Sequence, residues 1–174
     1  MLRILTKIQR TGILTESLPR YEEPVLQEIG EQLKAAVGER FNGSLSIRAV
    51  DAGSCNGCEL EIHALNNPYY GIERFGVHFV ASPRHADMLL VTGPVSRHME
   101  AALRRTYDAT PDPKLVIAVG DCGANGGEFG VSYASCGAVS NVIPVDAVIP
   151  GCPPAPLDLA RGILEAIGLR ASGK

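Results

Sequence analysis

The chain has 174 residues, of which 45% are hydrophobic and 20% charged, with a formal net charge of −3 at pH 7. This length predicts one domain with a buried core, and a slightly acidic chain with 5% aromatic residues and no Trp argues against nucleic-acid binding. No apolar run reaches the roughly 18 residues of a membrane span, and the N-terminus carries neither a signal peptide nor a twin-arginine pair, so we expect a cytoplasmic protein.

Residues 1–20 are predicted to form a segment of their own. No acidic residue precedes Glu16, whereas Arg3, Lys7 and Arg10 are basic. The apolar residues that share one helical face are Met1, Leu2, Ile4, Leu5 and Ile8. We predict that residues 1–20 are a basic amphipathic segment that docks on partner subunits or on the membrane. A terminus that only covers a neighbouring element is the alternative.

Residues 21–174 are predicted to form a single α/β domain. Pro24 begins a helix over 24–37, which Gly38 and the Asn42-Gly43 pair are expected to end. Strands are predicted over 45–50, 77–80, 88–93, 115–120 and 145–149, and further helices over 58–66, 99–107 and 156–167. Continuous apolar strands that alternate with helices indicate a compact, doubly wound, flavodoxin-like parallel sheet with helices on both faces. The functional site is then expected at the carboxyl ends of the strands.

Four cysteines follow three of these strands. Cys55 and Cys58 lie in Ser54–Ile62, Cys122 follows strand 115–120, and Cys152 follows strand 145–149. Because the carboxyl ends of parallel strands meet at one edge, four thiolates can converge there, as a [4Fe-4S] cluster requires. Cytoplasmic cysteines are also more typical of metal ligands than of disulfides. The sequence therefore favours an iron–sulfur site at the carboxyl edge of the sheet.

Two other interpretations of these cysteines remain open at this point. A redox dithiol at Cys55 and Cys58 would leave Cys122 and Cys152 without a role. Structural zinc usually uses two closely spaced pairs, whereas the separations here are 122 − 58 = 64 and 152 − 122 = 30 residues. Cys136 has no cysteine neighbour, and we expect it to be a small packed thiol outside the site.

Acidic residues near Cys58 are weaker candidates. Glu61 lies three residues after Cys58 and is a candidate proton or hydrogen-bond partner at the same site. Glu59 and His63 are one helical turn apart, and we expect a solvated pair, with a proton-handling role as the alternative. The glycines around Cys122 do not match the dinucleotide fingerprint, and no P-loop lysine follows, which disfavours nucleotide binding.

Taken together, these motifs resemble the small subunit of membrane-bound, energy-converting [NiFe] hydrogenases of the formate hydrogenlyase type. That subunit is homologous to the cluster-bearing B subunit of NADH–quinone oxidoreductase. The similar stretches are Ser54–Ile62, Ser82–Gly93, Gly120–Cys122 and Pro144–Pro154. The resemblance implies that Cys55, Cys58, Cys122 and Cys152 ligate one [4Fe-4S] cluster, the last relay before a catalytic site in a separate large subunit. Quinone-reducing relatives carry adjacent cysteines at the first position, so the spacing of Cys55 and Cys58 favours hydrogen chemistry.

The resemblance also implies partners and a location. The expected partners are a NiFe-carrying large subunit, a ferredoxin-like two-cluster subunit and integral membrane subunits, with no nucleic acid. The chain is expected to be a peripheral subunit on the cytoplasmic side of the membrane. Since it ends at Lys174 without a cysteine-rich extension, further clusters are expected in the partners. The subunit then relays electrons within an oxidoreductase complex and is not catalytic alone. A cluster subunit that passes electrons to quinone and a zinc-stabilised binding module are the alternatives.

Overall fold

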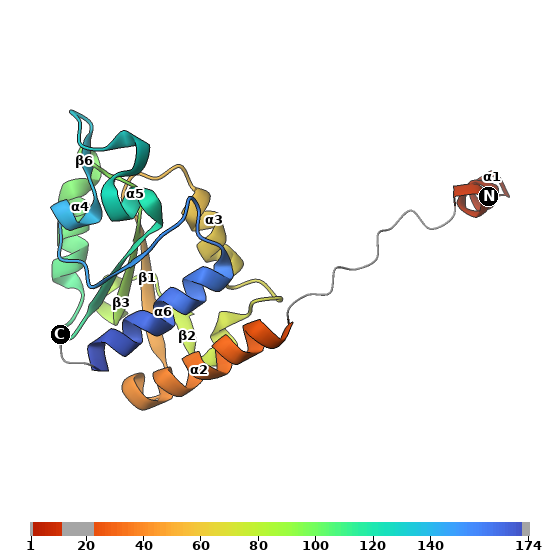
Figure 1. Ribbon diagram of the computed structural model, residues 1–174, viewed down its shortest axis with the longest axis horizontal. Coiled ribbons are helices and arrows are strands. Elements are labelled where there is room, and N and C mark those ends of the chain that lie inside the picture. The colour runs from red at the N-terminus through yellow and green to blue at the C-terminus, as the bar shows by residue number, and fades with distance from the viewer. Residues whose placement is uncertain (1, 12–22, 172–174) are drawn as a thin grey trace.

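The computed structural model describes residues 2–11 and 23–171 (Figure 1). In chain order the helices and strands are α1 (Leu2–Thr11), α2 (Glu23–Phe41), β1 (Leu45–Asp51), α3 (Gly57–Ala64), β2 (Val77–Phe79), β3 (Met88–Thr92), β4 (Val95–Ser96), α4 (Arg97–Ala109), β5 (Leu115–Val119), α5 (Gly120–Asn125), β6 (Ser135–Gly137), β7 (Ala147–Ile149) and α6 (Pro156–Ala171). Short 3-10 turns lie at Ile72–Phe75, Pro83–His85, Gly127–Phe129 and Val139–Asn141. Within the predicted segment 1–20, the structure describes only α1. The predicted boundary between residues 20 and 21 lies outside the described residues.

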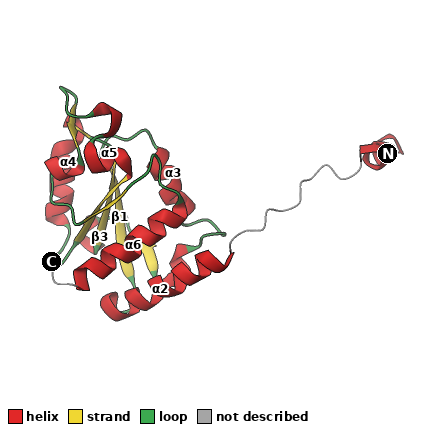
Figure 2. Cartoon of the chain, in the orientation of Figure 1, coloured by secondary structure: helices red, strands yellow, loops and turns green. Residues whose placement is uncertain are grey.

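The centre of the molecule is a parallel sheet. Within residues 23–171, five strands pair in the order β2-β1-β3-β5-β7, and every neighbouring pair is parallel. Figure 2 shows strands of this sheet in yellow among the red helices. This order corresponds to the 2-1-3-4-5 arrangement of flavodoxin-like sheets, in which ligands bind outside the carboxyl ends of the strands. The predicted α/β fold with a parallel sheet is confirmed.

Helices cover both faces of this sheet, as predicted. Helices α2, α3 and α6 pack on one face, and α4 packs on the other together with residues 135–143 (Figure 1). Side chains of a strand alternate between the two faces of the sheet. Leu90 and Ile117 therefore belong to the first core, beneath α2, α3 and α6, whereas Leu89 and Val116 belong to the second core, beneath α4. Both central strands, β3 and β5, are buried along their whole length. Their continuous apolar sequences are therefore explained by burial on two sides.

Helix α2 continues past the residue that was predicted to end it. Gly38 lies inside α2, which ends at Phe41. A single helical glycine costs only about 1 kcal/mol relative to alanine, so it does not by itself end a helix. The chain leaves the helix at Asn42 and Gly43, which both adopt positive φ angles (52° and 89°). The Asn-Gly pair, and not Gly38, is the stop signal.

Three short elements, α5, β4 and β6, were not predicted. Cys122 lies in the six-residue helix α5. Strands β4 and β6 form a small antiparallel pair beside the main sheet. Elements of two, three and six residues are too short to show a period of alternating hydrophobicity, which explains why the sequence pattern did not indicate them.

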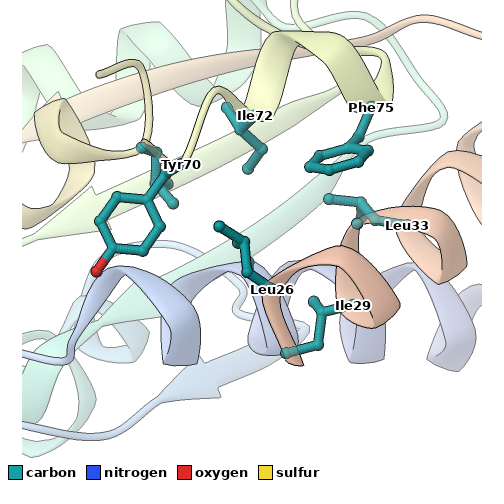
Figure 3. A pocket seen from close by; sticks show the side chains of 9 residues that line it. Leu26, Ile29, Leu33, Tyr70, Ile72 and Phe75 are labelled. Carbon is teal, nitrogen blue, oxygen red and sulfur yellow. The ribbon is translucent and has the colours of Figure 1, made fainter. Parts of the chain in front are cut away.

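A small apolar gap lies between α2, α6 and the 3-10 turn Ile72–Phe75 (Figure 3). Its lining includes Leu26, Leu33 and Phe75, and its cavity volume is about 10 Å³. That is room for one water at most, and an apolar lining offers such a water few hydrogen bonds. We therefore regard this gap as part of the packing around α2 and not as a ligand site.

The packing of α2 gives a matched pair of stability predictions. A Cβ atom added at Gly30 would lie 2.1 Å from Cζ of Phe75, whereas one added at Gly38 would meet nothing within 4 Å. We expect Gly30→Ala to lower the free energy of unfolding by about 1–3 kcal/mol through overpacking. Gly38→Ala should raise it by about 0.4–1 kcal/mol through better helix propensity. Urea denaturation of both variants checks this, and a stabilised Gly30→Ala protein would contradict the close packing.

Candidate metal centre

Three loops bring four cysteines to the carboxyl edge of the sheet. Cys55 and Cys58 follow β1, Cys122 follows β5, and Cys152 follows β7. In the sheet, β3 separates β1 from β5, and β7 lies next to β5. All five cysteines of the chain are free thiols. Cys55 and Cys152 are exposed, and Cys58 and Cys122 are partly buried. The candidate centre thus lies at the rim of the sheet with one side open to the surface.

The first loop is held by local hydrogen bonds at the end of β1. Oδ1 of Asp51 accepts from the backbone N–H groups of Gly53 (2.8 Å) and Ser54 (2.9 Å). Burial opposes ionisation of this carboxyl, but the hydrogen bonds from Ser54 and Gly53 prevail and lower the pKa of Asp51. Asn56, between the two cysteines, adopts the left-handed conformation (φ 69°) before α3 begins at Gly57. Asparagine tolerates this conformation better than most residues, which suits it to the turn between Cys55 and Cys58.

The second and third loops are tied to each other directly. The backbone N–H of Asp121 donates to the carbonyl of Gly151 (2.9 Å), and the N–H of Gly151 donates to Oδ1 of Asp121 (2.8 Å). Asp121 precedes Cys122, and Gly151 precedes Cys152. This reciprocal pair fixes the two cysteines relative to each other, although they are 30 residues apart in the sequence.

Glycine backbone lies close to two of the thiols. A Cβ atom at Gly120 (φ 78°) would lie 2.6 Å from Sγ of Cys58, and one at Gly127 (φ 54°) would lie 2.6 Å from Sγ of Cys122. A side chain at either position would therefore displace a thiol, and the positive φ angle favours glycine there as well. A Cβ atom at Gly57, in contrast, would lie 3.6 Å from Sγ of Cys55, which is an ordinary van der Waals contact. Gly120 and Gly127 are thus the positions where an added side chain would collide with a thiol that we assign to the site.

The thiols influence one another electrostatically. Burial raises the pKa of Cys58 to about 11, and the charges of Glu59, Cys55, Cys122 and Cys152 add to the shift. Burial also raises the pKa of Cys122, again with contributions from Cys152 and Cys55. Four anionic thiolates gathered at one edge repel each other, and a bound cation or metal cluster relieves that repulsion.

The donor set fits an iron–sulfur cluster. Its four ligands would all be thiolates, which is the usual set for a [4Fe-4S] cluster, and bare backbone beside Cys58 and Cys122 leaves room for the sulfur atoms. In residues 2–11 and 23–171, no three His, Cys, Asp or Glu side chains are grouped as a single metal ion would require. In a cluster, each cysteine binds a different iron atom, so the ligands lie farther apart than those of one ion.

Glu59 is the acidic residue that the sequence interpretation assigned wrongly. We expected a solvated pair with His63, but Oε1 of Glu59 accepts a hydrogen bond from the hydroxyl of Thr92, which is buried at the end of β3. Oε2 of Glu59 is also buried and has no hydrogen-bond partner among the described residues. His63 is exposed. The period of α3 could not reveal this, because the contact depends on the loop that joins β1 to α3.

Two other predicted residues occupy different surroundings. Glu61 is partly buried, and its charge acts on Tyr70: burial, Tyr69 and then Glu61 raise the pKa of that phenol. A role for Glu61 at the thiols stays a prediction. Cys136 is buried in the second core, as expected of a packed thiol, and its Sγ donates to Oε2 of Glu100 at 3.3 Å.

The raised pKa of Cys58 predicts a pH dependence in the cluster-free protein. The ordinary value is 9.0 and the folded value about 11, so the unfolded chain loses this proton first. The contribution of Cys58 to the free energy of unfolding is therefore fully present below about pH 9 and is lost as the pH rises toward 11. At pH 8 the thiolate fraction of Cys58 is about 100-fold lower in the folded than in the unfolded chain. A thiolate of higher pKa is also more nucleophilic, so we expect Cys58 to be alkylated only roughly tenfold more slowly in the folded than in the unfolded chain. Mass spectrometry of alkylated Cys58 measures the rate.

Glu59→Gln and Glu61→Gln provide the comparison for this rate. Glu59 contributes to the shift of Cys58 and Glu61 does not, although both are acids of α3. We expect Glu59→Gln to speed the alkylation of Cys58 and Glu61→Gln to leave it unchanged. The opposite result would place Glu61, and not Glu59, beside the thiols.

Comparison with known proteins places this arrangement in context. Residues 55–166 match the family described as NADH ubiquinone oxidoreductase, 20 Kd subunit. The chain is 43% identical to formate hydrogenlyase subunit 7 of Escherichia coli over 84% of its own length and 58% of the relative. It is 48% identical to the probable membrane-bound hydrogenase subunit mbhJ of Pyrococcus furiosus, over 68% of this chain and 71% of that protein. The chain thus spans less than two thirds of the Escherichia coli relative.

Solved structures show the same architecture. A subunit of the membrane-bound sulfane sulfur reductase, an archaeal respiratory membrane complex, has a TM-score of 0.67 and 34% identity, over 83% of this chain and 78% of that one. A chain of an NAD⁺-reducing [NiFe]-hydrogenase shares the fold at 19% identity and a TM-score of 0.50, over 65% of this chain and 85% of that chain. In the part of this chain that the structure describes, no helix combines the length and the apolar character needed to cross a membrane.

Proposed function

Since the chain belongs to the family of the 20 Kd subunit of NADH ubiquinone oxidoreductase, we propose that it is the electron-transfer subunit of a membrane-bound, hydrogenase-type oxidoreductase complex. Its relatives include subunits of oxidoreductase complexes. In this proposal Cys55, Cys58, Cys122 and Cys152 hold one [4Fe-4S] cluster at the carboxyl edge of the sheet. The observation that carries it is the convergence of three strand-end loops, each with its cysteines, on one edge.

The residues of this chain would hold and orient the cluster. When bound, a [4Fe-4S] cluster accepts and releases single electrons. The reciprocal hydrogen bonds of Asp121 and Gly151 fix two of the ligand loops. Gly120 and Gly127 keep the backbone beside the thiols free of side chains. The partly buried Cys58 and Cys122 face inward, while the exposed Cys55 and Cys152 leave a side that a redox partner can approach.

Metal analysis tests the cluster itself. Protein purified without oxygen should contain about four iron and four acid-labile sulfide per chain, with the EPR signal of a reduced [4Fe-4S] cluster. Zinc in place of iron would support the zinc-stabilised binding module and would contradict the proposal. Acid-labile sulfide is the decisive measurement, because a zinc site or a redox dithiol contains none.

The terminal electron acceptor is a separate question. Cys55 and Cys58 have the spacing that the resemblance associates with hydrogenases, and two relatives are named as subunits of a formate hydrogenlyase and of a membrane-bound hydrogenase. We therefore propose hydrogen chemistry at a NiFe centre in a large subunit. Assays of the intact complex with protons, quinone and sulfane sulfur as acceptors distinguish the three possibilities. Quinone reduction without hydrogen evolution would favour the role of an NADH–quinone oxidoreductase B subunit.

The partners and location follow from the same proposal. We propose a NiFe-carrying large subunit, a ferredoxin-like two-cluster subunit and integral membrane subunits as partners, and a peripheral position on the cytoplasmic side. Affinity purification of the tagged chain from solubilised membranes tests this composition. A chain recovered alone from the soluble fraction of cells that express the whole set of subunits would contradict it.

A further inference from the structure

Helix α1 (Leu2–Thr11) concentrates positive charge on one face. Arg3, Lys7 and Arg10 line a shallow surface hollow together with Thr6. At 3.6 residues per turn these positions share one side of the helix. The sequence of α1 contains no Asp or Glu, so the three cations are not neutralised within the helix.

The other side of α1 exposes aliphatic side chains. Ile4 is 64% exposed and Leu5 is 61% exposed (α1 in Figure 1). Leu5 lies roughly opposite Arg3 and Arg10 on the helix, and Ile4 lies between Leu5 and the basic side. A helix of ten residues is only marginally stable alone in water, so a surface that takes up its apolar side would stabilise it. Basic residues on one side and aliphatic residues on the other are typical of helices that lie in a membrane interface.

The charge of the rest of the chain strengthens this contrast. The whole chain carries −3 and α1 carries +3, so the remaining residues carry −3 − 3 = −6. An anionic bilayer repels that acidic remainder and attracts α1. Electrostatics would then turn α1, and not the acidic body, toward the membrane.

We propose that α1 binds the anionic lipid surface of a bilayer, with Arg3, Lys7 and Arg10 among the phosphate groups and Ile4 and Leu5 at the acyl boundary. Each basic residue near such a surface contributes about fivefold to binding, so three contribute roughly 100-fold. Binding of this size is reversible, and α1 would support the docking of a subunit that partners also hold. The proposal goes beyond the electron-transfer function and does not depend on the cluster.

Vesicle flotation of the full chain tests the proposal. The protein is mixed with phosphatidylcholine vesicles that either contain or lack phosphatidylglycerol, at low and at high salt. The test variant Arg3→Gln/Lys7→Gln/Arg10→Gln removes the basic face. The control variant Lys34→Gln/Arg84→Gln/Arg105→Gln removes the same charge from exposed positions outside α1. A third variant, Ile4→Ser/Leu5→Ser, removes the apolar side.

We expect the unaltered chain to float with anionic vesicles at low salt and to be released at high salt. The Arg3/Lys7/Arg10 variant should bind roughly 100-fold more weakly, the Ile4/Leu5 variant should also bind more weakly, and the control should bind like the unaltered chain. Equal binding to neutral vesicles, or unchanged binding of the Arg3/Lys7/Arg10 variant, would overturn the proposal. The proposal would also be overturned if the unaltered chain did not bind vesicles while the Arg3/Lys7/Arg10 variant failed to assemble into the complex. That result would assign α1 to an acidic protein partner.

Discussion

Cys122→Ala and Cys152→Ala proteins are expected to lack the normal [4Fe-4S] spectrum, whereas Cys136→Ala protein should retain it. Each of the first two changes removes a thiolate from the edge where three loops converge, and alanine offers no replacement ligand. Cys136 lies in the second core with its thiol on Glu100, so its removal affects packing and this hydrogen bond but none of the proposed ligands. EPR spectra and iron content of anaerobically purified protein measure the outcome.

This comparison has a built-in control for folding. Cys136 is the more buried residue, at 6% exposure, so Cys136→Ala tests whether the loss of any cysteine is enough to disturb the protein. We expect far-UV circular dichroism to show the same helix content in all three variants. Loss of the cluster in Cys136→Ala protein, or a normal cluster in Cys122→Ala protein, would mean that the ligands are assigned wrongly.

Gly120→Ala should also prevent normal cluster assembly, although it alters no proposed ligand. The added Cβ would lie 2.6 Å from Sγ of Cys58 and 3.3 Å from the carbonyl oxygen of Gly151, so both the thiol and the loop of Cys152 must shift. The left-handed backbone at φ 78° adds a strain of about 1–2 kcal/mol for alanine. We expect iron and sulfide per chain to fall by more than half.

Gly43→Ala is the matched control for this change. Gly43 also has a positive φ angle (89°), but a Cβ there would meet nothing within 4 Å. It precedes β1 and so lies at the opposite end of that strand from Cys55. Both variants should lose about 1–2 kcal/mol of folding stability to the left-handed backbone, measured by urea denaturation, but only Gly120→Ala should lose the cluster. Equal cluster content in the two variants would show that the contact of Gly120 with Cys58 does not matter for assembly.

The contact between Gly120 and Cys58 illustrates what local patterns leave out. The two residues are 120 − 58 = 62 positions apart, and their proximity arises because β1 and β5 both flank β3. The sequence indicated glycines around Cys122, but it did not indicate that Gly120 faces a different cysteine. Likewise, the sequence did not indicate that Asn56 adopts the left-handed conformation in the turn between Cys55 and Cys58.

The sequence by itself determined the parallel α/β sheet, the helices on its two faces and the placement of four cysteines after three strands. These features follow from hydrophobic periodicity and from the position of residues relative to strand ends, which are local properties of a chain. Only the tertiary structure decided that Glu59 accepts a hydrogen bond from the buried Thr92, that Asp121 and Gly151 join two loops, and that Gly120 lies on Cys58. Those contacts depend on the order of the strands in the sheet, which joins distant segments and leaves no periodic trace in the sequence.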